Sequence, residues 1–262
     1  MIYIDNLEYV YEDGTKALMN INMDLDKGNI VGIIGANGSG KSTLFLNIIG
    51  ILKPYSGSIK YNNIPIKYNK KFLRKYRQEV NIVFQDPDKQ LFYSNVYDDI
   101  AFSLRNLNLG EKEIAEKVNK ALKSVDAYNL KGKPTHFLSY GQKKRIAIAG
   151  VLVMDSNVIL FDEPTSGLDP YMTGEIKKII KNLSKEKKVI ISSHDMDLIY
   201  EICDYIYILG EGQVLGQGLP EDVFLEKDLL EKAYLEKPWL VKVHEELGLP
   251  LCKDEEQLFK LY

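Results

Sequence analysis

The sequence predicts an α/β fold, in which buried parallel strands alternate with helices. The continuous apolar run Ile30–Ile34 ends at a glycine loop and passes directly into a helical pattern, which is half of a βαβ unit. Further short β-branched runs end at polar residues, and a helix-rich stretch interrupts them. With 262 residues, of which 45% are hydrophobic and 27% charged, the chain has the composition of an ordinary globular protein of one large domain or a compact pair.

The elements are expected in the following order. Alternating apolar residues at 2, 4 and 7 and again at 21, 23 and 25 predict two strands near the N-terminus. The buried strand Ile30–Ile34 comes next, and the helical spacing of residues 41–52 ends at a Lys-Pro pair. Three more strands are expected at residues 80–84, 158–161 and 189–192, with a crossover helix at 172–183. Residues 96–154 are predicted to be helical throughout, most clearly over Glu111–Ser124.

This order predicts three parts. Residues 1–85 and 156–219 form the α/β core, and residues 86–155 form a helical subdomain inserted into it. After Pro220 the pattern changes to two charged amphipathic helices, broken at Lys237-Pro238, so residues 220–262 are expected to form a C-terminal helical extension.

Charge and hydropathy exclude several functional classes. The chain has 34 Lys and Arg against 37 Asp and Glu, a net charge of −3, so it lacks the basic excess of a nucleic-acid binder and we expect no nucleic-acid partner. Its longest apolar run, residues 146–154, is far below the ~18 residues needed to span a bilayer. The N-terminus lacks the hydrophobic segment of a secretory signal, and the two cysteines form no CxxC pair, so we expect reduced thiols inside the cell.

A glycine-rich loop follows the buried strand and fits the pattern GxxxxGK[ST]. Its glycines allow the backbone to turn where a Cβ would clash, and the helix that follows presents its positive end to an anion. In this pattern the lysine reaches the β- and γ-phosphates and the last hydroxyl binds Mg²⁺. The sequence therefore predicts a P-loop NTPase, with a phosphate site that continues into Thr43 and consists of Gly35, Ala36, Asn37, Gly38, Ser39, Gly40, Lys41 and Ser42.

Two carboxylates, Asp162 and Glu163, follow a second apolar strand at its carboxyl end, which is where α/β sheets bind their ligands. Asp162 is placed to hold Mg²⁺ and Glu163 to polarise an attacking water. An Asp-Glu pair after a strand is also common at the start of a helix, and only the phosphate loop upstream favours the functional interpretation.

A second anion site is predicted at the segment Leu138-Ser-Tyr-Gly-Gln142. Ser139 is a plausible N-cap for the helix that follows, and Gly141 permits close approach of the backbone to an anion. The chain has a single complete cradle of lysine and metal ligand, so this second site is expected to serve a nucleotide held by another subunit.

In this order the motifs resemble the ATP-binding-cassette (ABC) family over residues 1–220. The resemblance implies a RecA-like core with an antiparallel β subdomain, and ATP hydrolysis with Mg²⁺ that drives transport across a membrane. It implies that Tyr11 stacks on adenine, that Ser42, Gln85 and Asp162 hold Mg²⁺, and that Glu163, His194 and Gln85 are catalytic. Ser139, Gly141 and Gln142 would act on the partner's nucleotide, and Asp169 would belong to the loop after the carboxylates.

The chain departs from the family pattern at Tyr140, where glycine is usual. If this position requires a positive φ, tyrosine costs about 1–2 kcal/mol and weakens the shared site. If it is helical, with its side chain directed away, little changes. The sequence leaves both open, and the intact Ser139 and Gly141 favour a working site.

Residues 83–92, the Gly-Gln-Lys-Lys-Arg segment and the tail from Leu219 resemble the energy-coupling-factor ATPases, especially cobalt and nickel importers. This resemblance implies a second ATPase subunit, identical or not, an integral membrane coupling protein and a substrate-binding membrane subunit. The chain would then lie on the cytoplasmic face of the cell membrane as a peripheral subunit. Vitamins remain possible cargoes.

Two apolar sets have open assignments. The first could dimerise the extension or merely cap its own domain, and consists of Val223, Phe224, Leu229, Leu230 and Tyr234. The second could form a groove for a coupling helix or part of the core, and consists of Phe84, Leu91 and Phe92.

Other classes within the family are weighed on chain organisation. ABC ATPases of DNA repair have a long coiled-coil insertion, and those of translation have two tandem cassettes; neither pattern is present. Another importer or a separate-chain exporter remains an alternative. A purely regulatory nucleotide-binding protein is disfavoured, because Glu163 and His194 are both retained.

Overall fold

The computed structural model describes residues 1–260, which fall in two compact units. The first unit contains Met1–Leu73 and Ile190–Tyr262, and the second contains Arg74–Val189. The second unit holds the whole of the predicted helical segment together with strands and a helix that flank it. The three-part division by function therefore stays a prediction.

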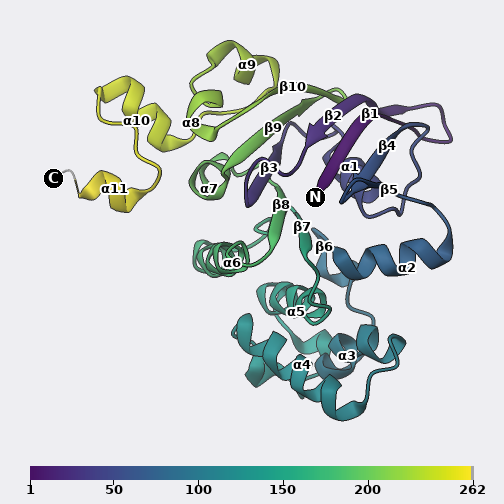
Figure 1. Ribbon diagram of the computed structural model, residues 1–262. Coiled ribbons are helices and arrows are strands. Elements are labelled where there is room, and N and C mark those ends of the chain that lie inside the picture. Colours follow the sequence, from purple (N-terminus) through teal and green to yellow (C-terminus); the bar gives the residue numbers. More distant parts are fainter. Residues whose placement is uncertain (261–262) are drawn as a thin grey trace. The chain divides into compact units, whose positions relative to one another are not determined.

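An antiparallel sheet lies in the first unit, with strand order β2-β1-β4-β5 (Figure 1). It consists of β1 (Ile2–Val10), β2 (Lys16–Asp24), β4 (Ser56–Tyr61) and β5 (Ile64–Pro65). The alternation predicted near the N-terminus is confirmed, because Ile2, Ile4 and Leu7 are all buried. Register shifts after Ile4 and Leu7 keep these apolar side chains buried despite the irregular spacing.

The second sheet of this unit positions the phosphate loop. Strand β3 (Ile30–Ile34) is buried along its whole length and has the predicted bounds. It pairs in parallel with β9 (Tyr205–Gly210), which in turn pairs antiparallel with β10 (Gln213–Gly218). The loop then leads into α1 (Lys41–Ile48), which ends four residues before the predicted end of the helix.

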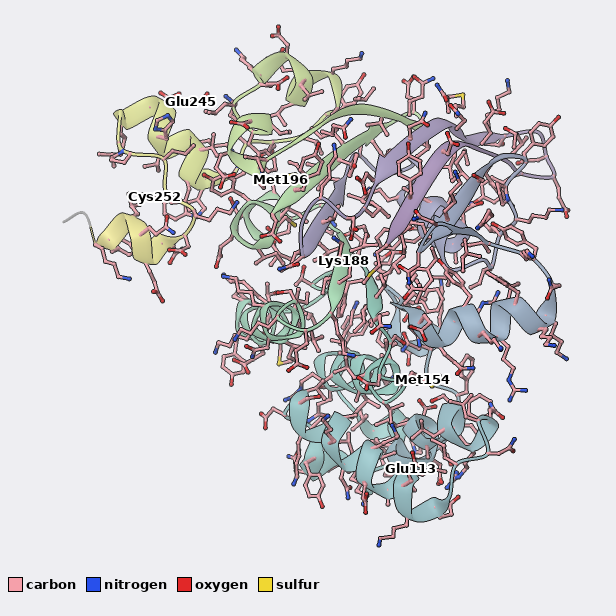
Figure 2. The ribbon with its side chains drawn as sticks, in the orientation of Figure 1. Glu113, Met154, Lys188, Met196, Glu245 and Cys252 are labelled. Carbon is pink, nitrogen blue, oxygen red and sulfur yellow. The ribbon has the colours of Figure 1, made fainter. Side chains whose placement is uncertain are left out.

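Four short helices make up the C-terminal extension, where the sequence predicted two. They are α8 (Pro220–Val223), α9 (Lys227–Lys232), α10 (Trp239–Leu247) and α11 (Glu255–Phe259), with Glu245 labelled on α10 and Cys252 before α11 in Figure 2. Positions 233–238 and 248–254 break the helical pattern, and Gly248 adopts a positive φ at the end of α10.

Burial decides between the two assignments left open for the apolar set of this extension. Val223, Phe224 and Leu230 are at most 2% exposed, and α8 packs on β10, β9 and α7 (Met196–Ile202) of the same unit. Phe224 meets the Tyr200 ring edge-on, with centroids 6.0 Å apart. These side chains therefore cap their own unit, and of the predicted set only Tyr234 is strongly exposed, at 85%.

In the second unit, β6 (Val80–Val83) pairs in parallel with β7 (Val158–Asp162). Helix α2 (Lys70–Glu79) leads into β6, and β8 (Lys188–Ser192) leads out toward the first unit. The helices of this unit are α3 (Val96–Asn106), α4 (Glu111–Ser124), α5 (Tyr140–Leu152) and α6 (Pro170–Leu183).

Helices α3, α4 and α5 pack on one another in the teal part of Figure 1. The bounds predicted for α4 are confirmed, but the prediction of continuous helix over residues 96–154 is wrong. Residues 125–139 form two short 3₁₀ turns and loops, because Gly132 and Pro134 interrupt the helical pattern. Of the helices described in residues 1–260, none is both long enough and apolar enough to cross a bilayer.

Candidate functional site

The loop between β3 and α1 has a backbone that only glycine supports at two positions. Gly35 has φ +155°, and a Cβ built there would lie 2.2 Å from the carbonyl oxygen of Leu209. Gly40 has φ +104°, and its Cβ would lie 2.7 Å from the carbonyl oxygen of Ala17. The loop is therefore pressed against β9 and β2, as the predicted phosphate cradle requires.

The start of α1 is arranged to hold an anion. Gly40 is its N-cap, so no side chain caps the first turn, and that turn contains no acidic residue. Lys41 is 7% exposed, and its Nζ donates hydrogen bonds to the carbonyl oxygens of Gly35 (2.7 Å) and Ala36 (3.1 Å). The buried Ser39 Oγ has no hydrogen-bond partner among residues 1–260, while Ser42 is exposed in the first turn. Uncapped N–H groups, a lysine and an orphaned hydroxyl fit a phosphate group.

Tyr11 is held beside this helix and has a partly exposed ring. Its hydroxyl pairs with Thr43 Oγ1 at 2.8 Å, and Tyr9 packs edge-on against its ring at 5.0 Å between centroids. A hollow of about 440 Å³ borders the ring and is lined by Tyr9, Tyr11, Glu12, Asp13 and Leu52. The fixed aromatic plane can stack on a planar base.

His194 also belongs to the first unit. It is exposed and lies two residues beyond the last residue of β8, Ser192.

The carboxylates lie in the second unit, at the end of β7. Asp162 is the last residue of this strand and Glu163 follows it, and each is 6% exposed. Glu163 has φ +47°, an uncommon conformation for a glutamate. The chain therefore turns sharply at Glu163 and leads toward Asp169, which is exposed and caps α6 by accepting a hydrogen bond from Met172 N at 2.8 Å.

Ser139 is the N-cap of α5, as predicted from the sequence. Its Oγ accepts a hydrogen bond from Gln142 N (3.3 Å), and its own N–H donates to Gln142 Oε1 (3.0 Å), so the two form a capping box. Ser139 is exposed and Gly141 is half-buried. The capping box therefore satisfies the start of α5 and leaves Ser139 exposed, while Gly141 lies against Met172 of α6.

Tyr140 is the first residue of α5 and has a helical backbone, so the strain expected for tyrosine at a positive φ does not arise at this position. Its hydroxyl donates to the carbonyl oxygen of Gln85 at 3.3 Å, and its ring lies against Gly167. The exposed Gln85 in turn donates from Nε2 to Ser166 Oγ at 3.4 Å. The side chain of Tyr140 therefore joins α5 to two loops of the predicted site.

Sequence reasoning missed Lys144, which is fully buried. Its Nζ donates to the carbonyl oxygens of Gln85 (2.5 Å) and Glu163 (3.2 Å). Burial lowers the pKa of its ammonium to about 8, although the charges of Asp162, Glu163 and Asp86 act in the opposite direction. A signal was present, since Lys144 is four residues after Tyr140 on an otherwise apolar helix face.

The predicted magnesium ligands divide between the units, with Ser42 in the first and Gln85 and Asp162 in the second. They offer a hydroxyl, an amide oxygen and a carboxylate, which is the hard oxygen donor set that Mg²⁺ prefers, with phosphate and water oxygens completing the shell. The residue types fit the ion.

A family model described as ABC transporter matches residues 18–166. The cobalt import ATP-binding protein CbiO of Salmonella typhimurium is 47% identical over 260 residues, 99% of this chain and 96% of the relative. The energy-coupling factor transporter ATP-binding protein EcfA2 of Clostridium perfringens is 48% identical over 240 residues, 91% of this chain and 84% of the relative.

Solved structures give the same picture. CbiO1 from Clostridium perfringens, described as part of the ABC transporter complex cbiONQ, has a TM-score of 0.81 and 46% identity, covering 94% of this chain and 95% of that one. The ATP-binding cassette MJ0796, solved as a dimer in a post-hydrolysis state bound to ADP and Pi, has a TM-score of 0.77 and 26% identity, covering 84% and 99%.

Proposed function

The chain belongs to the ABC transporter ATP-binding family, and on that premise we propose that it is the ATP-hydrolysing subunit of an energy-coupling-factor importer for cobalt. ATP-binding subunits of this family hydrolyse ATP to power transport. The observation that carries the proposal for this chain is the uncapped start of α1, with Lys41 folded over the glycine loop. Within residues 1–260 no side chain caps this helix start by a hydrogen bond, so its N–H groups can bind an anion.

ATP binds to the first unit in this account. Tyr11 stacks on the adenine, and the edge-on contact with Tyr9 and the bond to Thr43 fix its plane. The N–H groups of residues 36–43 and the Lys41 ammonium hold the phosphates, after Lys41 exchanges its bonds to loop carbonyls for phosphate oxygens.

Hydrolysis is assigned to the polar side chains of Gln85, Asp162, Glu163 and His194. Ser42, Gln85 and Asp162 would hold Mg²⁺, which when bound would supply positive charge next to the phosphates. Glu163 orients and polarises the attacking water, and His194 donates a hydrogen bond toward the γ-phosphate. The sharp turn at Glu163 supports this role, because a strained backbone at a strand end is typical of a catalytic residue.

A second cassette, identical or closely similar, completes the site. Ser139 at the start of α5 is exposed and Gly141 and Gln142 are half-buried beside it, so a partner's phosphates would approach this end of the helix at Ser139. The cassette MJ0796 is dimeric with ADP and Pi bound, which supports a pair of cassettes here. Asp169, exposed at the start of α6, would lie at the same interface.

The membrane partners bind next to the Gln85 loop. Phe92 is 77% exposed, whereas Phe84 and Leu91 are half-buried, so Phe92 alone of the predicted set is available for docking. Tyr93 and Phe102 are 41% and 43% exposed, with ring centroids 5.4 Å apart. We assign these three aromatics to the contact with an integral membrane coupling protein. This contact would hold the chain at the cytoplasmic face of the cell membrane. A separate membrane subunit then binds the cargo.

Two substitutions test the ATPase roles. Glu163→Gln is expected to bind ATP as the unaltered chain does while turnover collapses, which leaves a stable ATP-bound dimer. Lys41→Ala should impair nucleotide binding itself, because it removes the positive charge of the lysine that contacts the phosphates. ATP hydrolysis at the normal rate by the first variant would remove Glu163 from its role.

Cargo and complex are tested together. The chain, purified from membranes in mild detergent, should carry a coupling protein and a substrate-binding membrane protein with it. Cells that express this complex should accumulate labelled cobalt, and cells with Lys41→Ala should not. Uptake of nickel or a vitamin instead would change the cargo, and recovery of the chain only from the cytosol would contradict the transport role.

A further inference from the structure

The loop that carries Gln85 is attached to α5 at several points, all within the second unit. Lys144 and Tyr140, one helical turn apart, both donate to the carbonyl oxygen of Gln85. Lys143 pairs with Asp88 at 2.7 Å, and the side chain of Gln90 donates to the carbonyl oxygen of Ala147 at 2.7 Å. The loop and the helix are therefore held as one body.

Lys144 also makes a hydrogen bond beyond this loop. Its ammonium also donates to the carbonyl oxygen of Glu163, the residue at the sharp turn after β7. One buried cation thus lies between the two loops that carry Gln85 and Glu163. Both acceptors are main-chain oxygens. Movement of one loop therefore displaces the backbone of the other loop, and not only a side chain that can rotate freely.

We propose that Lys144 is a positioning residue, which fixes the Glu163 backbone to the Gln85 loop and to α5. The inference rests on the proposed catalytic function of Glu163. Its consequence is mechanical: when a partner moves α5 or the aromatics beside Gln85, the Glu163 carboxylate moves with them. Hydrolysis is then tied to the arrangement of the partners, while ATP binding at the glycine loop is not.

Replacement of Lys144 separates these two steps. Lys144→Met keeps an apolar stem of similar length but leaves both carbonyl oxygens without the ammonium. We expect kcat to fall about 10- to 100-fold, the loss that a small displacement of a catalytic group produces. ATP affinity should change by less than about two-fold, since the phosphate loop lies in the other unit and keeps its own contacts.

Two further variants provide rescue and control. Lys144→Arg keeps a cation with several N–H donors, so it should recover part of the lost kcat. Lys143→Met removes a neighbouring charge whose partner, Asp88, is 59% exposed, and it should leave kcat within about two-fold of the unaltered chain. Each variant is measured in the purified complex for kcat, ATP affinity and melting temperature.

The outcomes distinguish the inference from its premise. If Glu163→Gln still turns over ATP, the proposed function fails. If that variant is inactive while Lys144→Met, per folded molecule, keeps the kcat of the unaltered chain and only melts earlier, Lys144 is structural and the inference is overturned. If Lys144→Met does not fold, the Lys144→Arg and Lys144→Gln variants decide: reduced kcat at unchanged ATP affinity supports the inference, and unchanged kcat in both overturns it.

Discussion

Gly40→Ala tests the geometry of the phosphate loop. The new side chain must adopt φ near +104°, which costs about 1–3 kcal/mol for a residue other than glycine. Its Cβ would also lie 2.7 Å from the carbonyl oxygen of Ala17 and 3.0 Å from Leu18 Cδ2. Such overpacking adds about 1–3 kcal/mol more, because the nearer neighbour is backbone and has little room to move. We expect the free energy of unfolding to fall by about 2–6 kcal/mol.

Gly38→Ala is the matched control in the same loop. Gly38 also has a positive φ, +80°, but a Cβ built there meets nothing within 4 Å. Only the backbone term remains, about 1–2 kcal/mol. The difference between the two variants therefore isolates the contact with Ala17.

Urea unfolding followed by circular dichroism measures both values, and titration with ATP measures the effect on the site. Gly40→Ala should lose more stability than Gly38→Ala and should bind ATP more weakly than the unaltered chain. Equal stability of the two variants, or a Gly40→Ala chain as stable as the unaltered one, would refute the close packing of the loop on β2.

The other predictions concern the first unit. Phe224→Ala should reduce the free energy of unfolding by about 3–5 kcal/mol, because it empties a fully buried site against Tyr200, whereas Tyr234→Ala, at an 85% exposed ring, should stay within about 0.5 kcal/mol. The same urea titration checks both, and an unchanged Phe224→Ala would mean that α8 does not cap its unit. Cys203 is buried and burial raises the pKa of its thiol, and Cys252 is 5% exposed. Ellman's reagent at pH 8 should therefore modify neither thiol until guanidinium unfolds the chain, and rapid reaction of the folded chain would contradict this burial.

The local motifs of this fold could be predicted from the sequence because their physical causes are local. The strand Ile30–Ile34 is a run of apolar residues bounded by glycine, and it has the predicted bounds. Ser139 and Gln142 are spaced as a capping box, which depends only on residues three apart. In both cases a few neighbouring side chains determine the structure.

The helical subdomain shows where such reasoning fails. Apolar spacing continued through residues 125–139, so the sequence predicted helix there, but the structure has 3₁₀ turns and loops. The prediction gave too little weight to Gly132 and Pro134, which interrupt a helix.

Tertiary context decided the remaining cases. An apolar face on the extension fits a partner or its own unit equally well, and only the packing of Phe224 on Tyr200 separates the two. Lys144 was overlooked because lysine is ordinarily exposed, and its acceptors at Gln85 and Glu163 are 59 and 19 residues away in the chain. Tyr140 could be assigned to the helical alternative only once its backbone conformation was known.

The central claim is that two cassettes close on each nucleotide, with the phosphate loop of one facing the exposed start of α5 of the other. A crystal structure of the Glu163→Gln variant with ATP and Mg²⁺, in the assembly purified from membranes, tests it most directly. We expect Ser139 Oγ of one cassette to lie within hydrogen-bond distance of the γ-phosphate held by the loop of its partner. A γ-phosphate enclosed entirely by one chain, with Ser139 in solvent, would contradict it.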